Sequence, residues 1–105
     1  AVFMKKNESC LQSIVAVMDI FGNKWSFFII HELCSGPKHY NQLRKELHIN
    51  TKSLSDTLKH LEENGIISRS VTPTTPVTVE YDLTEKGHDF DSVLTAMYDW
   101  RKKWS

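Results

Sequence analysis

Leucines recur at helical spacing in the middle of the chain, between residues 41 and 64. Residues three or four apart lie on one face of an α-helix, so the pattern predicts two amphipathic helices, at 41–47 and 51–64. Only the three residues His48–Asn50 separate them, which is enough for a tight turn. The leucines on the two predicted buried faces are Leu43, Leu47, Leu54, Leu58 and Leu61.

The pattern changes from a helical to an alternating period after Gly65. We expect strands at Ile66–Val71 and Val77–Leu83, because in the second of these apolar residues alternate with Thr78, Glu80 and Asp82. A Thr/Pro loop, 72–76, joins the two strands. Two helices at a tight turn, followed by a hairpin, form a winged helix-turn-helix. The expected fold class is therefore α+β, mainly α, with a two-stranded wing.

Further helices are predicted on both sides of this motif. Ser9 is a good N-cap for a helix from Cys10 to about Ile20, which Gly22 ends. A second helix starts near Lys24 and stops at Ser35-Gly36-Pro37. The side chains expected to point inward from it are Trp25, Phe28, Ile29 and Leu33.

Capping residues mark the ends of the remaining helices. Asn41 and Asn50 are the predicted N-caps of the helix-turn-helix pair, and Gly65 ends its second helix. Thr84 is the predicted N-cap of a last helix that runs to about Trp104, with Gly87 as a weak point in its first turn. We expect one domain, 1–105, made of a tail (1–8), the helix-turn-helix (41–64), the wing (66–83) and a C-terminal helix (84–104), together with the two helices before the motif.

The second helix of the pair presents short hydroxyls and flexible cations opposite its leucine stripe. Such side chains suit base edges and phosphates, although any amphipathic helix has a solvated face. The following wing favours the DNA-binding interpretation. The exposed residues expected in its N-terminal half are Thr51, Lys52, Ser53, Ser55, Asp56 and Lys59.

The first and last helices carry more apolar surface than one small core can bury. Surplus apolar surface of this kind marks an interface, and a two-fold dimer is the simplest arrangement that covers it. The other interpretation is that both helices are central within one subunit. The residues predicted at the dimer interface are Leu11, Ile14, Val15, Met18, Val93, Met97, Trp100 and Trp104.

Charge is segregated along the chain, although the formal net charge is zero. Residues 36–61 sum to +3, whereas 62–80 sum to −2 and 81–105 to −1. A modest basic patch therefore coincides with the helix-turn-helix, as DNA binding requires. The cations of this patch are Lys38, Arg44, Lys45, Lys52 and Lys59.

Composition excludes several other classes of protein. The longest nearly unbroken apolar run, Trp25–Ile30, is too short to span a bilayer, and no signal-like segment precedes it. Met4 is the expected natural start, with Ala1–Phe3 a remnant of cloning. Two cysteines make no disulfide framework, so a cytoplasmic location is expected.

A set of residues spread over nearly the whole chain forms a recognisable pattern. Its members are Cys10, Gly22–Trp25, His39–Leu43, Leu54, Leu58, Leu61, Glu62, Gly65–Ile67, Val79–Tyr81, Leu83, Thr84, Gly87 and Trp100. With these residues in this order, the chain resembles the HxlR-type family of bacterial transcriptional regulators, a winged-helix group related to MarR. The resemblance implies a homodimer that binds double-stranded DNA at an inverted-repeat operator.

The resemblance also implies a role for individual positions. Lys24 and Tyr40, Asn41 and Gln42 would lie near phosphates, and Thr51–Lys59 would be the recognition helix, with Asn50 at its start. Arg69, Thr72, Thr74 and Thr75 would belong to the wing. One departure is that 72–76 carries no basic residue, so we expect this wing mainly to position the protein rather than to read the minor groove.

Cys10 is the candidate for redox sensing, because members of the family respond to oxidants or electrophiles through an N-terminal cysteine. A helix N-terminus and the neighbouring Lys5 and Lys6 favour a thiolate. The alternative is an inert small residue at the dimer seam. Cys34 is expected in the core. A small-molecule effector is compatible with the sequence, but its class is not indicated.

Two other kinds of function compete with DNA binding. A winged-helix module that binds protein instead of DNA fits the neutral net charge and the acidic C-terminal segment. A metal site at His31 and Cys34, one helical turn apart, lacks a second pair of ligands, so no metal or cofactor is expected. No catalytic constellation or Gly-rich phosphate loop is evident, so we do not expect an enzyme.

Overall fold

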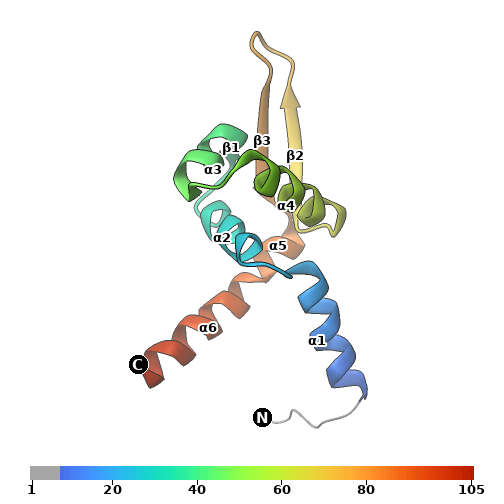
Figure 1. The fold of residues 1–105 in the computed structure, drawn as a ribbon, viewed down its shortest axis with the longest axis vertical. Helices are drawn as coiled ribbons and strands as arrows, with labels where there is room; N and C mark the ends of the chain where they lie inside the picture. The colour runs from blue at the N-terminus through green and yellow to red at the C-terminus, as the bar shows by residue number, and fades with distance from the viewer. Residues whose placement is uncertain (1–7) are drawn as a thin grey trace.

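A computed structural model describes residues 8–105 (Figure 1). The tail expected at 1–8, with Met4, Lys5 and Lys6, lies outside the described residues except for Glu8, which begins a helix. The elements follow in the order α1 (Glu8–Ile20), α2 (Lys24–Leu33), β1 (Lys38–His39), α3 (Tyr40–Leu47), α4 (Thr51–Glu63), β2 (Ile67–Thr72), β3 (Thr78–Leu83), α5 (Glu85–Asp89) and α6 (Asp91–Trp104).

The core lies where α2, α3 and α4 pack on the base of the sheet. Leu43 from α3 and Leu54 and Leu61 from α4 are fully buried, and Leu58 is 1% exposed, which confirms the predicted leucine faces. Leu47 is half-buried at the edge. The other core side chains are Phe21, Ile29, Ile30, Leu33, Ile49, Ile66, Ile67, Tyr81 and Leu83.

The sheet has three antiparallel strands in the order β1-β3-β2. β2 and β3 form the predicted hairpin, with Ile67 opposite Leu83 and Thr72 opposite Thr78, so each strand begins one residue later than expected. The wing was expected to be two-stranded, but β1 adds a short third strand opposite Tyr81 and Glu80. Two residues are too few to show a period-two pattern, which is why this strand was not predicted.

Local caps explain where most helices begin. The side chains of Asn50 and Thr84 accept hydrogen bonds from the backbone of Ser53 and Gly87, as predicted. Two predicted caps are wrong. Ser9 lies inside α1, which already begins at Glu8. Asn41 lies inside α3, because β1 leads directly into a helix that begins at Tyr40.

The last helix is two helices that meet at Phe90, not one. Gly87 in α5 is buried, and a Cβ there would collide with the carbonyl oxygen of Ile66. Its lack of a side chain thus allows α5 to pack directly on the chain that enters β2, which gives this glycine a packing role instead of making it a weak point.

Both terminal helices project from the body, on the side opposite the wing (Figure 1). Every residue from Leu11 to Asp19 is exposed, and α6 contains no buried residue. Two residues that were expected to be buried are exposed because they do not face the core. They are Phe28 of α2, which is 44% exposed, and Cys34, the C-cap of α2. Within the described part, no single helix is long and apolar enough to cross a membrane, although Ser9–Ile20 and Lys24–Leu33, bent by 74°, meet the length and composition criteria as a pair.

Candidate nucleic-acid interface

The N-terminal half of α4 forms an exposed polar surface beside the wing. The leucine stripe and Thr57 are buried on the core side, so Thr51, Lys52, Ser55, Asp56 and Lys59 face solvent, while Ser53 is half-buried. Asn50 holds the start of this surface in place, since its Oδ1 accepts a 2.8 Å hydrogen bond from the Ser53 N–H.

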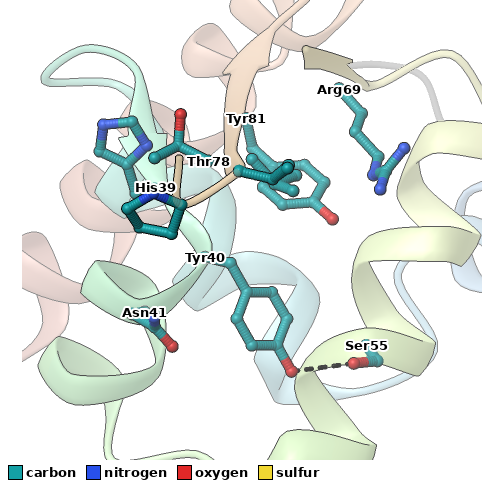
Figure 2. Close-up of a pocket in the computed structure, with 10 residues that line it drawn as sticks. His39, Tyr40, Asn41, Ser55, Arg69, Thr78 and Tyr81 are labelled. Atoms are coloured by element: carbon teal, nitrogen blue, oxygen red, sulfur yellow. Dashed lines mark hydrogen bonds between the residues drawn. The ribbon is translucent and has the colours of Figure 1, made fainter. Parts of the chain in front are cut away.

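Tyr40 joins the two helices across the turn. Its hydroxyl donates to the Thr51 carbonyl oxygen at 3.2 Å and lies 2.9 Å from Ser55 Oγ (Figure 2). The carbonyl can only accept, so the Tyr40 proton points to Thr51 and the Ser55 hydroxyl donates to Tyr40. The first residue of α3 therefore fixes the first turn of α4. Asn41 and Gln42 are exposed beside it, and Gln42 Oε1 accepts the His39 N–H at 3.2 Å.

A surface groove of about 540 Å³ separates these helices from the wing. Tyr40, Asn41 and Ser55 line it from the helices, and Arg69 and Thr78 line it from the strands (Figure 2). Arg69 forms no ion pair with any residue of the described range, so its guanidinium is available to an anion. The structure thus brings together residues that are up to 38 positions apart in the chain.

The predicted wing threonines are not among the residues that line this groove. Thr72, Thr74 and Thr75 are exposed, and Thr72 forms the last pair of the hairpin, opposite Thr78. Thr74 is partly engaged, because its hydroxyl donates to the Pro76 carbonyl oxygen at 2.9 Å. The groove therefore reaches the hairpin loop at Pro76 and Val77, but not at these three threonines.

Two cations of the basic patch are paired with carboxylates. Lys38, whose side chain is only 16% exposed, lies 3.2 Å from Glu46 and 4.0 Å from Glu32. The hydrogen bond from Lys38 lowers the pKa of the Glu46 carboxyl below its ordinary value. Lys38 therefore ties α3 to α2 and adds little to a DNA-binding surface, contrary to its inclusion in the predicted patch. Lys52 pairs with Asp56 at 3.0 Å, but both are well exposed and can separate.

Lys24 lies outside the groove, at the start of α2. Its ammonium is 5.1 Å from the centroid of the Trp25 ring, a cation–π distance. The preceding residue, Asn23, caps α2 by accepting from the Ser26 N–H. Lys24 follows the last residue of α1 by four positions and is not among the residues that line the groove.

The two cysteines occupy different environments. Cys10 is half-buried near the start of α1. Cys34 is exposed after α2, where its thiol lies 3.9 Å from Asp91 Oδ1. Partial burial, and then the negative charge of Asp91, raise the pKa of the Cys34 thiol. The His31 side chain is 79% exposed, and no group of three or more potential metal ligands occurs within residues 8–105.

His60 forms a contact that the sequence did not indicate. Its Nε2 lies 2.7 Å from the Asp19 carbonyl oxygen, which joins the C-terminal half of α4 to the end of α1. Helical geometry alone places His60 on a flank of α4 and indicates no partner for it. A backbone acceptor 41 residues away leaves no signal in a hydrophobic pattern.

Comparison with known proteins agrees with this geometry. The sequence profile of HxlR-like helix-turn-helix proteins matches residues 20–105. The chain belongs to this family. Its relatives include the HTH-type transcriptional regulator YodB of Bacillus subtilis (strain 168), 40% identical over 86 residues that cover 81% of this chain and 77% of YodB. The members of the family are transcriptional regulators with a DNA-binding helix-turn-helix, not enzymes.

Solved structures give the same fold. The reduced form of the transcriptional regulator YodB from B. subtilis superposes with a TM-score of 0.76 at 35% identity, covering 93% of this chain and 91% of that one. The redox regulator HypR in its oxidized form gives 0.79 at 29% identity, covering 87% and 95%. The winged helix-turn-helix prediction and the resemblance to HxlR-type regulators are therefore confirmed.

Proposed function

We propose that this protein is a bacterial transcriptional regulator that binds operator DNA sequence-specifically as a homodimer. α4 would enter the major groove and the wing would lie along the backbone. The observation that carries the proposal is the polar face of α4, which stands opposite a fully buried leucine stripe and is held at its N-terminus by Tyr40. A rigid helix with short hydroxyls and cations facing outward suits base-edge readout.

The groove beside α4 supplies candidates for backbone contacts. The Arg69 guanidinium lines this groove and suits a phosphate. The Tyr40 and Ser55 hydroxyls lie beside it, and to donate to DNA their protons would have to leave Thr51 and Tyr40. Asn41 and Gln42 extend it at the start of α3, and Thr72, Thr74 and Thr75 would meet a more distant stretch of backbone. Lys24 would contact phosphate only if DNA reached the start of α2. Because its partner is chromosomal DNA, we propose that the protein acts in the cytoplasm.

The exposed apolar faces of α1 and α6 support the homodimer. Leu11, Ile14 and Met18 on α1 are 46–61% exposed, and Met97, Trp100 and Trp104 on α6 are 50–70% exposed. Monomeric proteins rarely leave so much contiguous apolar surface in water. A second copy would cover both helices and bring two recognition helices onto one inverted repeat. Val15 and Val93 belong to the same faces.

Cys10 is the proposed oxidant or electrophile sensor. Its place on α1, a helix proposed to lie in the dimer seam, would allow a change at sulfur to alter how two copies associate. The matched YodB and HypR structures include forms described as reduced and oxidized. Non-reducing electrophoresis after mild oxidation, with wild type and Cys10→Ser, tests this role: a cross-linked dimer that persists in the variant would exclude Cys10 as the linking residue.

Fluorescence anisotropy with duplexes from the gene's own upstream region tests DNA binding. If a dimer neutralises at least ~5 phosphates, the slope of log affinity against log salt is about −4 or steeper. A slope near zero, or no binding across several upstream duplexes, would instead support the alternative of a winged-helix module that binds protein.

A further inference from the structure

The contact between His60 and Asp19 crosses from the recognition helix to a terminal helix. The Asp19 carbonyl oxygen can only accept, so the His60 imidazole donates its Nε2–H over 2.7 Å. Asp19 is the next-to-last residue of α1, and His60 lies nine residues into α4. Figure 1 shows the C-terminal half of α4 next to the end of α1 from which that helix leaves the body.

α1 is attached to the body at this end. Its residues from Leu11 to Asp19 are all exposed, whereas Ile20 is half-buried and Phe21 is 3% exposed. The Phe21 ring stacks on Phe90 with centroids 4.2 Å apart and on Phe27 at 5.4 Å. These three rings anchor the inner ends of α1 and α6 together on α2. The stacking joins the inner ends of the two helices through apolar contact, and the His60 hydrogen bond adds a directional contact between α1 and α4.

A helix held at one end behaves as a lever. The 13 residues of α1 span ~20 Å, so a rotation of roughly 10° at its inner end displaces the outer end by about 3.5 Å relative to α4. That distance is close to one base-pair step in DNA, about 3.4 Å. If two subunits meet through α1, the direction of α1 sets the distance between their recognition helices. A single directional contact at the inner end of α1 can therefore change that distance.

We propose that His60 is a positioning residue that fixes the spacing of the two recognition helices and so selects the half-site separation of the operator. The inference rests on the homodimeric DNA-binding function proposed above. His60 acts through Asp19 and the direction of α1, not through a base or a phosphate, because its donor nitrogen is already engaged by the carbonyl. Losing this bond would let α1 take a range of directions, and the dimer would then accept several spacings.

The test compares His60→Leu, which removes the donor, with His60→Gln, whose amide retains an N–H at similar reach. His88→Leu is the matched control, because it makes the same change at an exposed histidine of α5 whose side chain forms no hydrogen bond or ion pair with any described residue. The probe is the inverted repeat that wild type selects from a randomised duplex pool. It is used with spacers altered by one and two base pairs, and as a single half-site.

We expect wild type, His60→Gln and His88→Leu to share one sharp spacing optimum. In His60→Leu the preference for that optimum should fall about fivefold, the net effect of one lost hydrogen bond, while affinity for the single half-site stays unchanged. A spacing profile identical to wild type would overturn the inference. An equal loss on every duplex, the half-site included, would also overturn it, because the defect would then lie in how each recognition helix binds DNA and not in the spacing between the two. Failure of wild type to bind any duplex would refute the DNA-binding proposal itself.

Discussion

The hydroxyl of Tyr40, the first residue of α3, lies 2.9 Å from the hydroxyl of Ser55 in the second turn of α4. The same Tyr40 oxygen donates to the Thr51 carbonyl at 3.2 Å. One side chain thereby positions the N-terminal turns of the recognition helix from outside that helix. Tyr40 is half-buried, and its accessible part lines the groove.

Tyr40→Phe is expected to lower the free energy of unfolding by about 1 kcal/mol, because it removes one donor and one acceptor while keeping the ring. It should also weaken DNA binding, since the first turn of α4 loses its external support. Ser55→Ala removes only the hydrogen bond between the Ser55 and Tyr40 hydroxyls and leaves the one to Thr51, so it should lower the free energy of unfolding by less. Urea titration measures the first effect and anisotropy the second. Unchanged values for both in Tyr40→Phe would show that the Tyr40 hydroxyl positions nothing.

Lys59→Ala should weaken DNA binding at every sequence and reduce the magnitude of the salt slope by about 2, because each subunit of the dimer loses one phosphate contact. Lys59 is exposed and lies opposite the leucine stripe, so stability should not change. Lys52→Ala should act similarly, because in wild type the exposed Lys52 can leave Asp56 and contact a phosphate instead. Lys103→Ala at the end of α6 is the control and should leave the slope unaltered. Equal losses of binding and stability in Lys59→Ala would contradict the assignment of this face.

Met97→Glu should convert the dimer to a monomer, because it places a charge in the middle of the exposed apolar face of α6. Helical content should persist, since Met97 is 50% exposed in the single subunit. Thr95→Glu adds the same charge on the other side of α6 and should leave the dimer intact. Sedimentation velocity distinguishes the two variants. A dimer that survives Met97→Glu would remove α6 from the proposed interface.

Gly87→Ala should lower stability by about 2 kcal/mol or more, because the added methyl would collide with the backbone oxygen of Ile66 and α5 would have to move. Gly22→Ala is a milder comparison, since its added carbon would meet one carbonyl, that of Met18, at 3.2 Å. Thermal unfolding of both variants measures the difference. Equal melting temperatures would mean that α5 can shift without loss of packing.

Cys34 should be alkylated slowly at pH 8, because its raised pKa leaves less of the reactive thiolate at that pH. Asp91→Asn removes the neighbouring charge, although partial burial still raises the pKa, so the rate should increase without reaching that of a fully solvated thiol. The gain should disappear at a pH above both pKa values, where each thiol is fully ionised. Mass spectrometry of the Cys34 peptide gives the rate, and Asp89→Asn is the control. No acceleration at pH 8 in Asp91→Asn would contradict the proposed charge effect.

Patterns that depend on neighbours in the chain were predicted well. The stripe of Leu54, Leu58 and Leu61 predicted both the existence of α4 and its outward face, because helical geometry alone relates residues three and four apart. Asn50 and Thr84 were predicted as caps for the same reason, since a cap bonds to a backbone group three residues away. The wing followed from alternation in 77–83.

Features that depend on distant partners were decided only by the tertiary structure. β1 exists because β3 offers an edge to Lys38 and His39, and it moves the start of α3 from the expected cap Asn41 to Tyr40. Cys34 was expected in the core, but the end of α2 turns it outward toward Asp91. The sequence places Lys38 in the basic patch, but in the structure its ammonium pairs with Glu32 and Glu46.

The sequence by itself determined the first four helices, the hairpin and the outward face of α4, because each follows from periodicity or from capping over a few residues. Only the tertiary structure decided that Tyr40 supports α4, that Arg69 shares a groove with Ser55, and that His60 holds the end of α1. These contacts join residues 11 to 41 positions apart. Their partners are chosen by the packing of whole elements, which no local pattern records.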